Sequence, residues 1–248
     1  TGTNVGSNAG ENTGSSIRLQ PGALALVTGN VTVDAYFLPG IVTHAGKSDI
    51  LVAQGGGLVN TNGSAGTYSV GNLYNVTNFT VTGITATDTL VQFDVAAAAA
   101  LTDAYWKGAY TGGITDTWSV SNGSTSSNWT TDLAGTIATG QVPSIATNVF
   151  LSAVGQANQN DMVLGADTTI KTLTVNTSDT STPILLKADG GYKLTIDLAA
   201  AITVDSGASA TTIASKLAFN AATATIAVNS VTANPLTLSG IVSGAAIT

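Results

Sequence analysis

The sequence predicts an all-β protein in which short strands stack as the rungs of a β-solenoid. Apolar and polar side chains alternate in short runs, most clearly over 192–204, where Leu194 and Ile196 flank Thr195. A period of two residues is typical of a strand with one buried face. Each run lasts only about four to seven residues before a turn residue interrupts it. Runs this short cannot bury their apolar faces alone and must stack on neighbouring runs.

The same alternation recurs along most of the chain. Its core-facing pairs in the first part are Leu24/Leu26, Val31/Val33, Ile50/Val52, Tyr68/Val70, Phe79/Val81 and Val91/Phe93. Later pairs are Val149/Leu151, Met162/Leu164, Leu173/Val175, Ile184/Leu186, Ile202/Val204, Ile226/Val228 and Leu236/Leu238. Turn residues separate them every 8–12 residues or so, a spacing that suits a sandwich as well as a solenoid. With about 20 residues per rung, a solenoid of the whole chain would have roughly a dozen rungs.

An Ala-rich boundary at 96–105 is predicted to divide the chain into two modules. Ala96–Ala100 has a helix-forming composition but is too short for a stable helix, so we expect at most a single helical turn. Residues 1–95 then form an N-terminal module that is solenoid-like in its periodicity. The second module, 106–248, begins with all three tryptophans of the chain, Trp106, Trp118 and Trp129.

The composition predicts a polar surface with few charges. Only 8% of the residues are charged, and 14 acidic side chains against 7 basic ones give a net charge of −7. Because no basic patch can form, we expect no binding of nucleic acid and no insertion into a membrane by this segment. The chain has no cysteine, which excludes disulfides and thiolate metal sites.

Several motifs from residue 105 onward resemble those of one protein family. They are Trp106, Trp118, Ser127-Asn128-Trp129, Asn148-Val149-Phe150, the run ADTTIKTLTV at 166–175, PLTLSG at 235–240 and Val242-Ser243-Gly244. This pattern resembles passenger modules that carry the autotransporter-associated β-strand repeat. The glycine-rich repeat that usually follows the Val-Ser-Gly block is missing before Thr248. Residues 1–95 share the periodicity of the family but none of its motifs.

The resemblance implies a right-handed parallel β-helix that is secreted or displayed on a bacterial surface. We therefore expect a structural role, either as an elongated stalk or as a subunit that stacks end to end into a fibre. The open edges of a parallel stack pair readily with another copy of the chain. The residues expected to make this contact are Ile17, Leu24 and Leu26 at one end and Leu236, Leu238 and Ile241 at the other.

Two other functions remain open. An adhesin could stack glycans on aromatic faces, and the candidate ligand-binding residues are Trp106, Tyr110, Trp118 and Trp129; the alternative, which we favour, is that these rings plug the start of the second module. A polysaccharide-degrading enzyme would need converging carboxylates, for which Asp197 and Asp205 are candidates. We assign no catalytic residue, metal or cofactor, because the single histidine, His44, lacks a nucleophile motif around it and the carboxylates look like turn residues.

Overall fold

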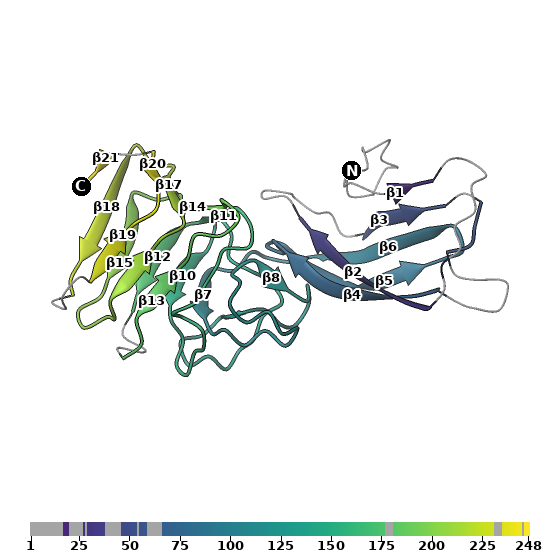
Figure 1. Cartoon of the computed structure of the whole chain (residues 1–248), viewed down its shortest axis with the longest axis horizontal. Helices are drawn as coiled ribbons and strands as arrows, with labels where there is room; N and C mark the ends of the chain where they lie inside the picture. The colour runs from purple at the N-terminus through teal and green to yellow at the C-terminus, as the bar shows by residue number, and fades with distance from the viewer. Residues whose placement is uncertain are drawn as a thin grey trace.

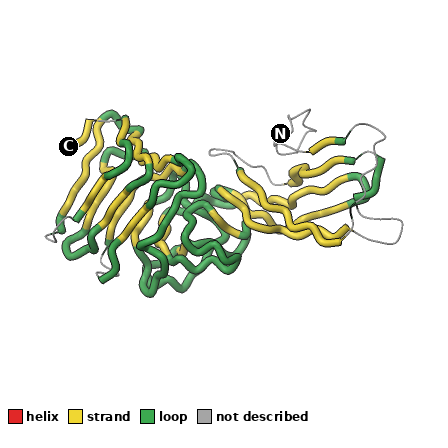
Figure 2. The backbone as a smooth tube through the Cα atoms, viewed as in Figure 1, coloured by secondary structure: helices red, strands yellow, loops and turns green. Residues whose placement is uncertain are grey.

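The computed structural model describes residues 17–19, 27, 29–37, 46–53, 55–58, 66–176, 181–230, 235–244 and 246–248. Every regular element in these ranges is a strand, as Figure 2 shows in yellow. The described residues contain no helix long and apolar enough to cross a membrane. The prediction of an all-β fold is confirmed.

A parallel β-helix occupies the second part of the chain and shows the predicted solenoid fold (Figure 1). Its strands form three sheets that surround a common core. The first sheet has the order β21-β18-β15-β12-β10-β7-β9, the second β11-β14-β17-β20 and the third β13-β16-β19. Except for β9, every strand in these three sheets runs parallel to its neighbours.

The bounds of these strands show how short each one is. They are β7 (Asp103–Trp106), β9 (Trp129–Thr130), β10 (Asn148–Leu151), β11 (Thr168–Ile170), β12 (Thr172–Val175), β13 (Ile184–Leu186), β14 (Lys193–Ile196), β15 (Ala200–Val204), β16 (Thr211–Ile213), β17 (Lys216–Phe219), β18 (Thr223–Val228), β19 (Leu236–Leu238), β20 (Val242–Ser243) and β21 (Ala246–Ile247). The strand β8 (Val120–Ser121) lies between β7 and β9 in the chain but pairs with a strand of the N-terminal module.

The length of a turn can be read from the side-chain hydrogen bonds between successive turns. Asn220 bonds to Asp197, Ser152 to Asn176 and Lys193 to Asp167, over separations of 23, 24 and 26 residues. Turns are therefore longer than the predicted 20 residues or so. The 4-stranded second sheet shows that the helix has about four turns. The prediction of a dozen rungs is wrong, because the first part of the chain does not join the stack.

The core of the β-helix consists of apolar columns that run along its axis. Val149 of β10, Leu173 of β12 and Ile202 of β15 occupy the same register position on neighbouring strands, and all three are buried. Outward-facing polar residues form hydrogen bonds along the helix axis, from one strand to the next. Asn148 donates to Asp103 (2.9 Å) and accepts from Thr172 (3.0 Å). Each turn is thus held to the next by packing inside and by hydrogen bonds outside.

The N-terminal module is built differently from the predicted solenoid. Its strands are β1 (Ile17–Arg18), β2 (Gly29–Tyr36), β3 (Gly46–Val52), β4 (Gly66–Tyr74), β5 (Phe79–Ala86) and β6 (Leu90–Ala97). They form two sheets, β1-β3-β6-β5 and β2-β4-β8, in which β6 runs antiparallel to β3 and β5, and β8 antiparallel to β4. A core that includes Leu73, Phe79 and Phe93 lies between the sheets.

The solenoid-like interpretation of residues 1–95 is therefore wrong for the described part of that range. Alternation with a period of two is the same in parallel and antiparallel strands, so it could not reveal the pairing. The decisive feature is the tight connection from β5 to β6, where Thr87 N–H donates to Leu90 O at 2.7 Å. So short a link permits only an antiparallel neighbour, because a parallel crossover needs about a dozen residues or more.

The Ala-rich segment does not form the predicted helical turn. Ala96 and Ala97 end β6, and 98–102 has no regular structure. The backbone N–H of Ala98 bonds to Asn78 O, and Leu101 is buried in the β-helix core. The segment thus connects the last strand of one core to the first strand of the other.

An ion pair on the N-terminal sheet gives a prediction for stability. Lys47 and Asp94 are register partners on β3 and β6, with Nζ 2.5 Å from Oδ1, and Thr85 donates to the other carboxylate oxygen at 2.7 Å. The hydrogen bond from Lys47 lowers the pKa of Asp94 below its usual value. A carboxyl whose pKa is lowered by folding stabilises the protein above its unfolded pKa, and this contribution is lost as the pH falls through the folded pKa.

We expect Asp94→Asn to lower the free energy of unfolding at pH 7 by up to about 1 kcal/mol, because both side chains are partly exposed. The difference from wild type should shrink as the pH is lowered from about 5 to about 2, where the wild-type carboxyl becomes protonated. Urea denaturation across that pH range measures both effects. A difference that stays constant with pH would contradict the assignment.

Candidate functional site

The first turn of the β-helix is closed by a cluster of the three tryptophans. Trp129 packs edge to face against Trp106 and Trp118, with ring centroids 5.3 and 5.0 Å apart and interplanar angles of 81° and 88°. All three side chains are 0% exposed. Trp106 and Trp129 are also register partners in the antiparallel pair of β7 and β9. The cluster therefore covers the apolar interior at the point where the parallel stack begins.

Every indole N–H in this cluster has a partner within the fold. Trp106 donates to Ala157 O at 2.9 Å, Trp129 to Trp118 O at 2.8 Å and Trp118 to the Met162 sulfur at 3.3 Å. A buried N–H without a partner would cost about 1–3 kcal/mol, so these bonds let large amphipathic rings fill the core. The tryptophans leave neither a ring face nor a donor for a ligand.

Tyr110 is also buried, with 4% of its surface exposed. The prediction that Trp106, Tyr110, Trp118 and Trp129 form a glycan-stacking platform is therefore wrong, because a sugar needs an accessible ring face. The other interpretation of the sequence, a plug at the start of the second module, agrees with their position. The glycan prediction came from the clustering of aromatic residues in the sequence. Such clustering does not reveal whether the rings are buried in a cap or exposed on a surface.

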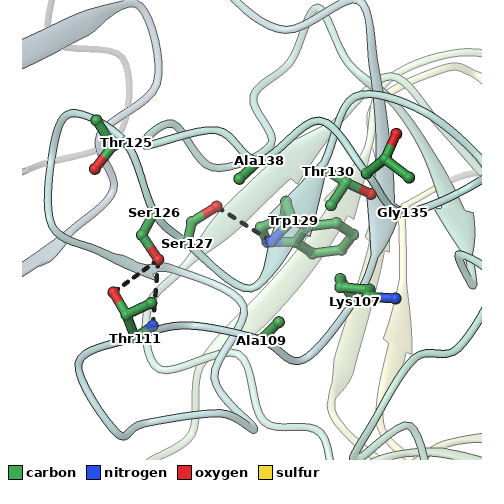
Figure 3. Close-up of a pocket in the computed structure, with 11 residues that line it drawn as sticks. Lys107, Ala109, Thr111, Thr125, Ser126, Ser127, Trp129, Thr130, Gly135 and Ala138 are labelled. Carbon is green, nitrogen blue, oxygen red and sulfur yellow. Dashed lines mark hydrogen bonds between the residues drawn. The ribbon is translucent and has the colours of Figure 1, made fainter.

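A small hollow lies over this cap but does not change that conclusion (Figure 3). Its volume is about 280 Å³, and its lining includes Lys107, Ser126 and Trp129. Trp129 lies at its floor, yet no part of the side chain reaches solvent. Thr136, which lines the hollow, donates its hydroxyl to Asp132 at 2.8 Å. Asp132 also accepts a hydrogen bond from Ile137 N–H at 2.7 Å, and this bond is the main cause of its lowered pKa. The polar groups here hold a loop together.

The opposite end of the β-helix is open. Strands β19, β20 and β21 are each the last strand of their sheet. The apolar side chains that continue the core columns, Ile226, Leu236 and Leu238, are only partly buried. Further out, Ile241 is 70% exposed and Ile247 is 49% exposed. The last described turn thus presents both free strand edges and apolar surface.

This open end also lacks charge. Residues 217–248 contain no Asp, Glu, Lys, Arg or His, whereas Lys171, Lys193 and Lys216 lie on earlier turns. Proteins usually protect exposed sheet edges with charged side chains, above all lysine, because a bare edge pairs with other chains. The last turn carries no such protection.

The residues predicted for self-assembly lie in quite different settings. Leu236, Leu238 and Ile241 do belong to the open last turn. At the other end, Ile17 lies in β1 and pairs with Leu51 of β3, so it borders a mixed sheet and not the β-helix. Leu24 and Leu26 lie outside the described residues. In the first sheet of the β-helix the parallel strands begin at β7, and the antiparallel strand β9 covers this edge.

The carboxylates considered for an enzyme lie at strand ends. Asp197 follows β14 and accepts a hydrogen bond from Asn220 at 3.0 Å, and the main-chain carbonyl of Asp205, after β15, accepts one from Ala208 N–H at 3.1 Å. Within the described ranges, no three His, Cys, Asp or Glu side chains gather closely enough to hold a metal ion. His44 lies outside the described residues. That the protein is not an enzyme stays a prediction.

A second and larger hollow was missed by the sequence analysis. It has a volume of about 410 Å³, and it lies between strands β2 and β4 and the loop after Tyr110. Thr32 and Asp34 of β2 line it, with Asn72 of β4. The available signal was the alternation of Thr32, Asp34 and Tyr36, which places three side chains with polar groups on one face of a strand.

Comparisons with known protein families, with curated proteins and with solved structures find no match to this chain. The resemblance to passenger modules with the autotransporter-associated repeat therefore stays a prediction.

Removing a ring from the cap should affect stability strongly. We expect Trp129→Ala to lower the free energy of unfolding by about 3–5 kcal/mol, because it leaves a large cavity and an unpaired carbonyl at Trp118. Urea denaturation measures the loss. Tyr105→Ala is the control, since Tyr105 stacks on Phe150 on the outer face of β7 and β10 and is partly exposed. Equal, small effects of both changes would show that the tryptophans do not form a structural plug.

Proposed function

We propose that this protein has a structural role outside the cell, as an elongated β-solenoid on a bacterial surface, and that its open last turn is the point of contact with a second copy. The observation that carries the proposal is the bare end of the stack: three terminal strand edges, partly exposed core side chains and no charge over 217–248. Such an end is stabilised when further β-structure covers it.

A second copy is the occupant that best suits this surface. Two uncharged ends can approach without like-charge repulsion, although the whole chain carries a net charge of −7. When a twofold axis that passes through one sheet relates the copies, the free edge of the last strand of that sheet, such as β21, meets its own equivalent in antiparallel register, which gives well-aligned hydrogen bonds. The contact would also bury Ile241 and Ile247, which are exposed in the single chain.

The closed first turn determines the shape of this assembly. A head-to-tail fibre requires that the last turn of one copy stack on the first turn of the next. Here β9 covers the edge of β7, and the tryptophans fill the interior behind it. The geometry therefore favours a finite pair joined at the open ends, which is a rod of twice the length, over an endless fibre. Such a rod suits the stalk form of the predicted role.

This proposal predicts dimers that form through the last turn. Sedimentation velocity from about 1 to about 100 μM should show a monomer–dimer equilibrium, and negative-stain electron microscopy should show rods of two lengths. The double variant Ile241→Lys/Ile247→Lys should remain monomeric, because it places like charges at the contact. These side chains are exposed, so the variant should fold normally.

The matched control is Ile137→Lys/Val154→Lys. It changes two equally exposed apolar residues near the closed end, and it should dimerise like wild type. Monomers of the wild-type protein at every concentration would contradict the proposed contact. Filaments of unlimited length would contradict the inference that one end is closed.

A further inference from the structure

The face of β2 that points away from the core of the N-terminal module carries a row of side chains with polar groups. Thr32, Asp34 and Tyr36 are exposed, whereas Val33 and Ala35 between them are partly buried and pack against the core. Phe37, next along the chain, packs edge to face on Phe79 in that core at 4.8 Å. The strand therefore holds the row in a fixed orientation toward solvent.

A β-bulge in the neighbouring strand shapes this face. Val33 pairs with Val70 but Ala35 pairs with Leu73, so Gly71 and Asn72 of β4 together lie opposite Asp34. The backbone N–H of Asn72 donates to Asp34 Oδ1 at 2.6 Å. A Cβ atom on Gly71 would lie 2.1 Å from the same oxygen, so only glycine admits the carboxylate here. Bulges of this kind commonly aim a side chain at a functional position.

The cap of the β-helix supplies the facing wall. Buried Tyr110 donates its hydroxyl to Asn72 Oδ1 at 2.9 Å, which ties the loop after Tyr110 to the N-terminal sheet. Thr111, Gly112 and Asn122 complete the lining of the 410 Å³ hollow. Binding sites for small molecules commonly form where two domains meet, as these two cores do.

Two stacked tyrosines continue the same face beyond Asp34. The rings of Tyr36 and Tyr74, which are register partners on β2 and β4, have centroids 6.0 Å apart and are inclined by 21°. Tyr36 is 45% exposed, so unlike the tryptophans it offers an accessible ring. Burial and then the nearby charge of Asp34 raise the pKa of Tyr74 above its usual value.

The polar groups around these rings still have capacity to bond a ligand. Within the part of the chain that the structure describes, Asp34 uses Oδ1 for Asn72, and Asn72 uses Oδ1 for Tyr110. No hydrogen bond of the described residues reaches Asp34 Oδ2 or Asn72 Nδ2. An acceptor, a donor and an exposed aromatic face thus lie on one surface, beside a hollow.

We propose that this surface, formed by Thr32, Asp34, Tyr36, Asn72 and Tyr74, binds an uncharged glycan. A pyranose has an apolar C–H face that packs on an aromatic ring, and its hydroxyls both donate and accept hydrogen bonds. Asp34 Oδ2 accepts from one hydroxyl and Asn72 Nδ2 donates to another, while Tyr36 packs against the ring. A hollow of this volume accommodates a ligand of one or two sugar units.

The local charge selects against acidic sugars. Asp34 lies in the site, and the charges of Asp116 and Asp167 are close enough to contribute to the raised pKa values of Tyr74 and Tyr36, after the larger effect of burial. A uronate or sialate would bring its carboxylate toward these groups and be repelled. The site therefore takes neutral hexoses or N-acetylhexosamines and rejects polyuronates.

The test is titration of the 248-residue chain with neutral oligosaccharides, followed by NMR or calorimetry. The probes are cello-, xylo-, manno- and chito-oligosaccharides of two to four units, with oligogalacturonate as the acidic counterpart. We expect one neutral series to bind and oligogalacturonate not to bind. Tyr36→Ala and Tyr74→Ala should each weaken binding about tenfold, the usual size of an aromatic contribution together with its buried area.

Two more variants test whether binding depends on this surface and not on any exposed aromatic ring or on the stability of the fold. Tyr105→Ala removes a ring from the other stacked pair, Tyr105 and Phe150, and should leave binding unchanged. Gly71→Ala keeps every aromatic ring but displaces the Asp34 carboxylate, and it should weaken binding while thermal unfolding shows a folded protein. Dimerisation is measured separately, because the open last turn is not part of this site.

Three outcomes would overturn the proposal. The first is that no neutral oligosaccharide binds at millimolar concentration. The second is that binding survives both tyrosine changes in variants that are folded. The third is that Tyr105→Ala abolishes binding instead, which would place the sugar on the outer face of the β-helix.

Discussion

A parallel stack of strands has two open ends, and closing the first one is the constraint on which this structure depends. The columns of Val149, Leu173 and Ile202 are stable only if water is excluded from the turn beneath them. The tryptophan cluster provides that cover, and β9 pairs with the edge of β7 that would otherwise be bare. Because each indole N–H bonds within the fold, the cover costs no unpaired donor.

The two ends of the β-helix differ, because only the first is closed. The last described turn ends all three sheets of the β-helix and leaves core side chains only partly buried, and it is also the part without charged side chains. Symmetric ends would allow endless stacking, whereas one closed end limits the assembly to contacts between open ends. In the proposed pair, the rod is therefore at most twice the length of one chain at any concentration.

The sequence predicted the strands well and their pairing only in part. Alternation over 192–204 and its neighbours correctly indicated short strands that must stack, and these strands pair in parallel because a whole turn separates each from the next of its sheet. The same alternation in the first 95 residues led to the wrong architecture, since the short link after Ala86 decides the pairing and alternation does not.

The candidate site was predicted less well than the strands. The sequence drew attention to the tryptophans, but it could not show that they are buried, because burial is a property of the packed fold. Asp34 and Tyr36 were missed because their site needs the bulge at Gly71, which no local pattern reveals.

The two cores meet where both depart from regular structure, and this explains the position of the proposed glycan site. A regular β-helix face repeats the same small polar side chains on each turn, which gives little to distinguish one ligand from another. At the junction, by contrast, the bulge aims Asp34 outward, and the buried hydroxyl of Tyr110 fixes Asn72 from the opposite wall. The second contact depends on the cap, because the backbone N–H groups of Tyr110 and Thr111 donate to Asn128 Oδ1 and Ser126 Oγ, in the segment that leads to Trp129. The closing of the first turn thus supports the fold and, in the same residues, one wall of the surface that recognises a ligand.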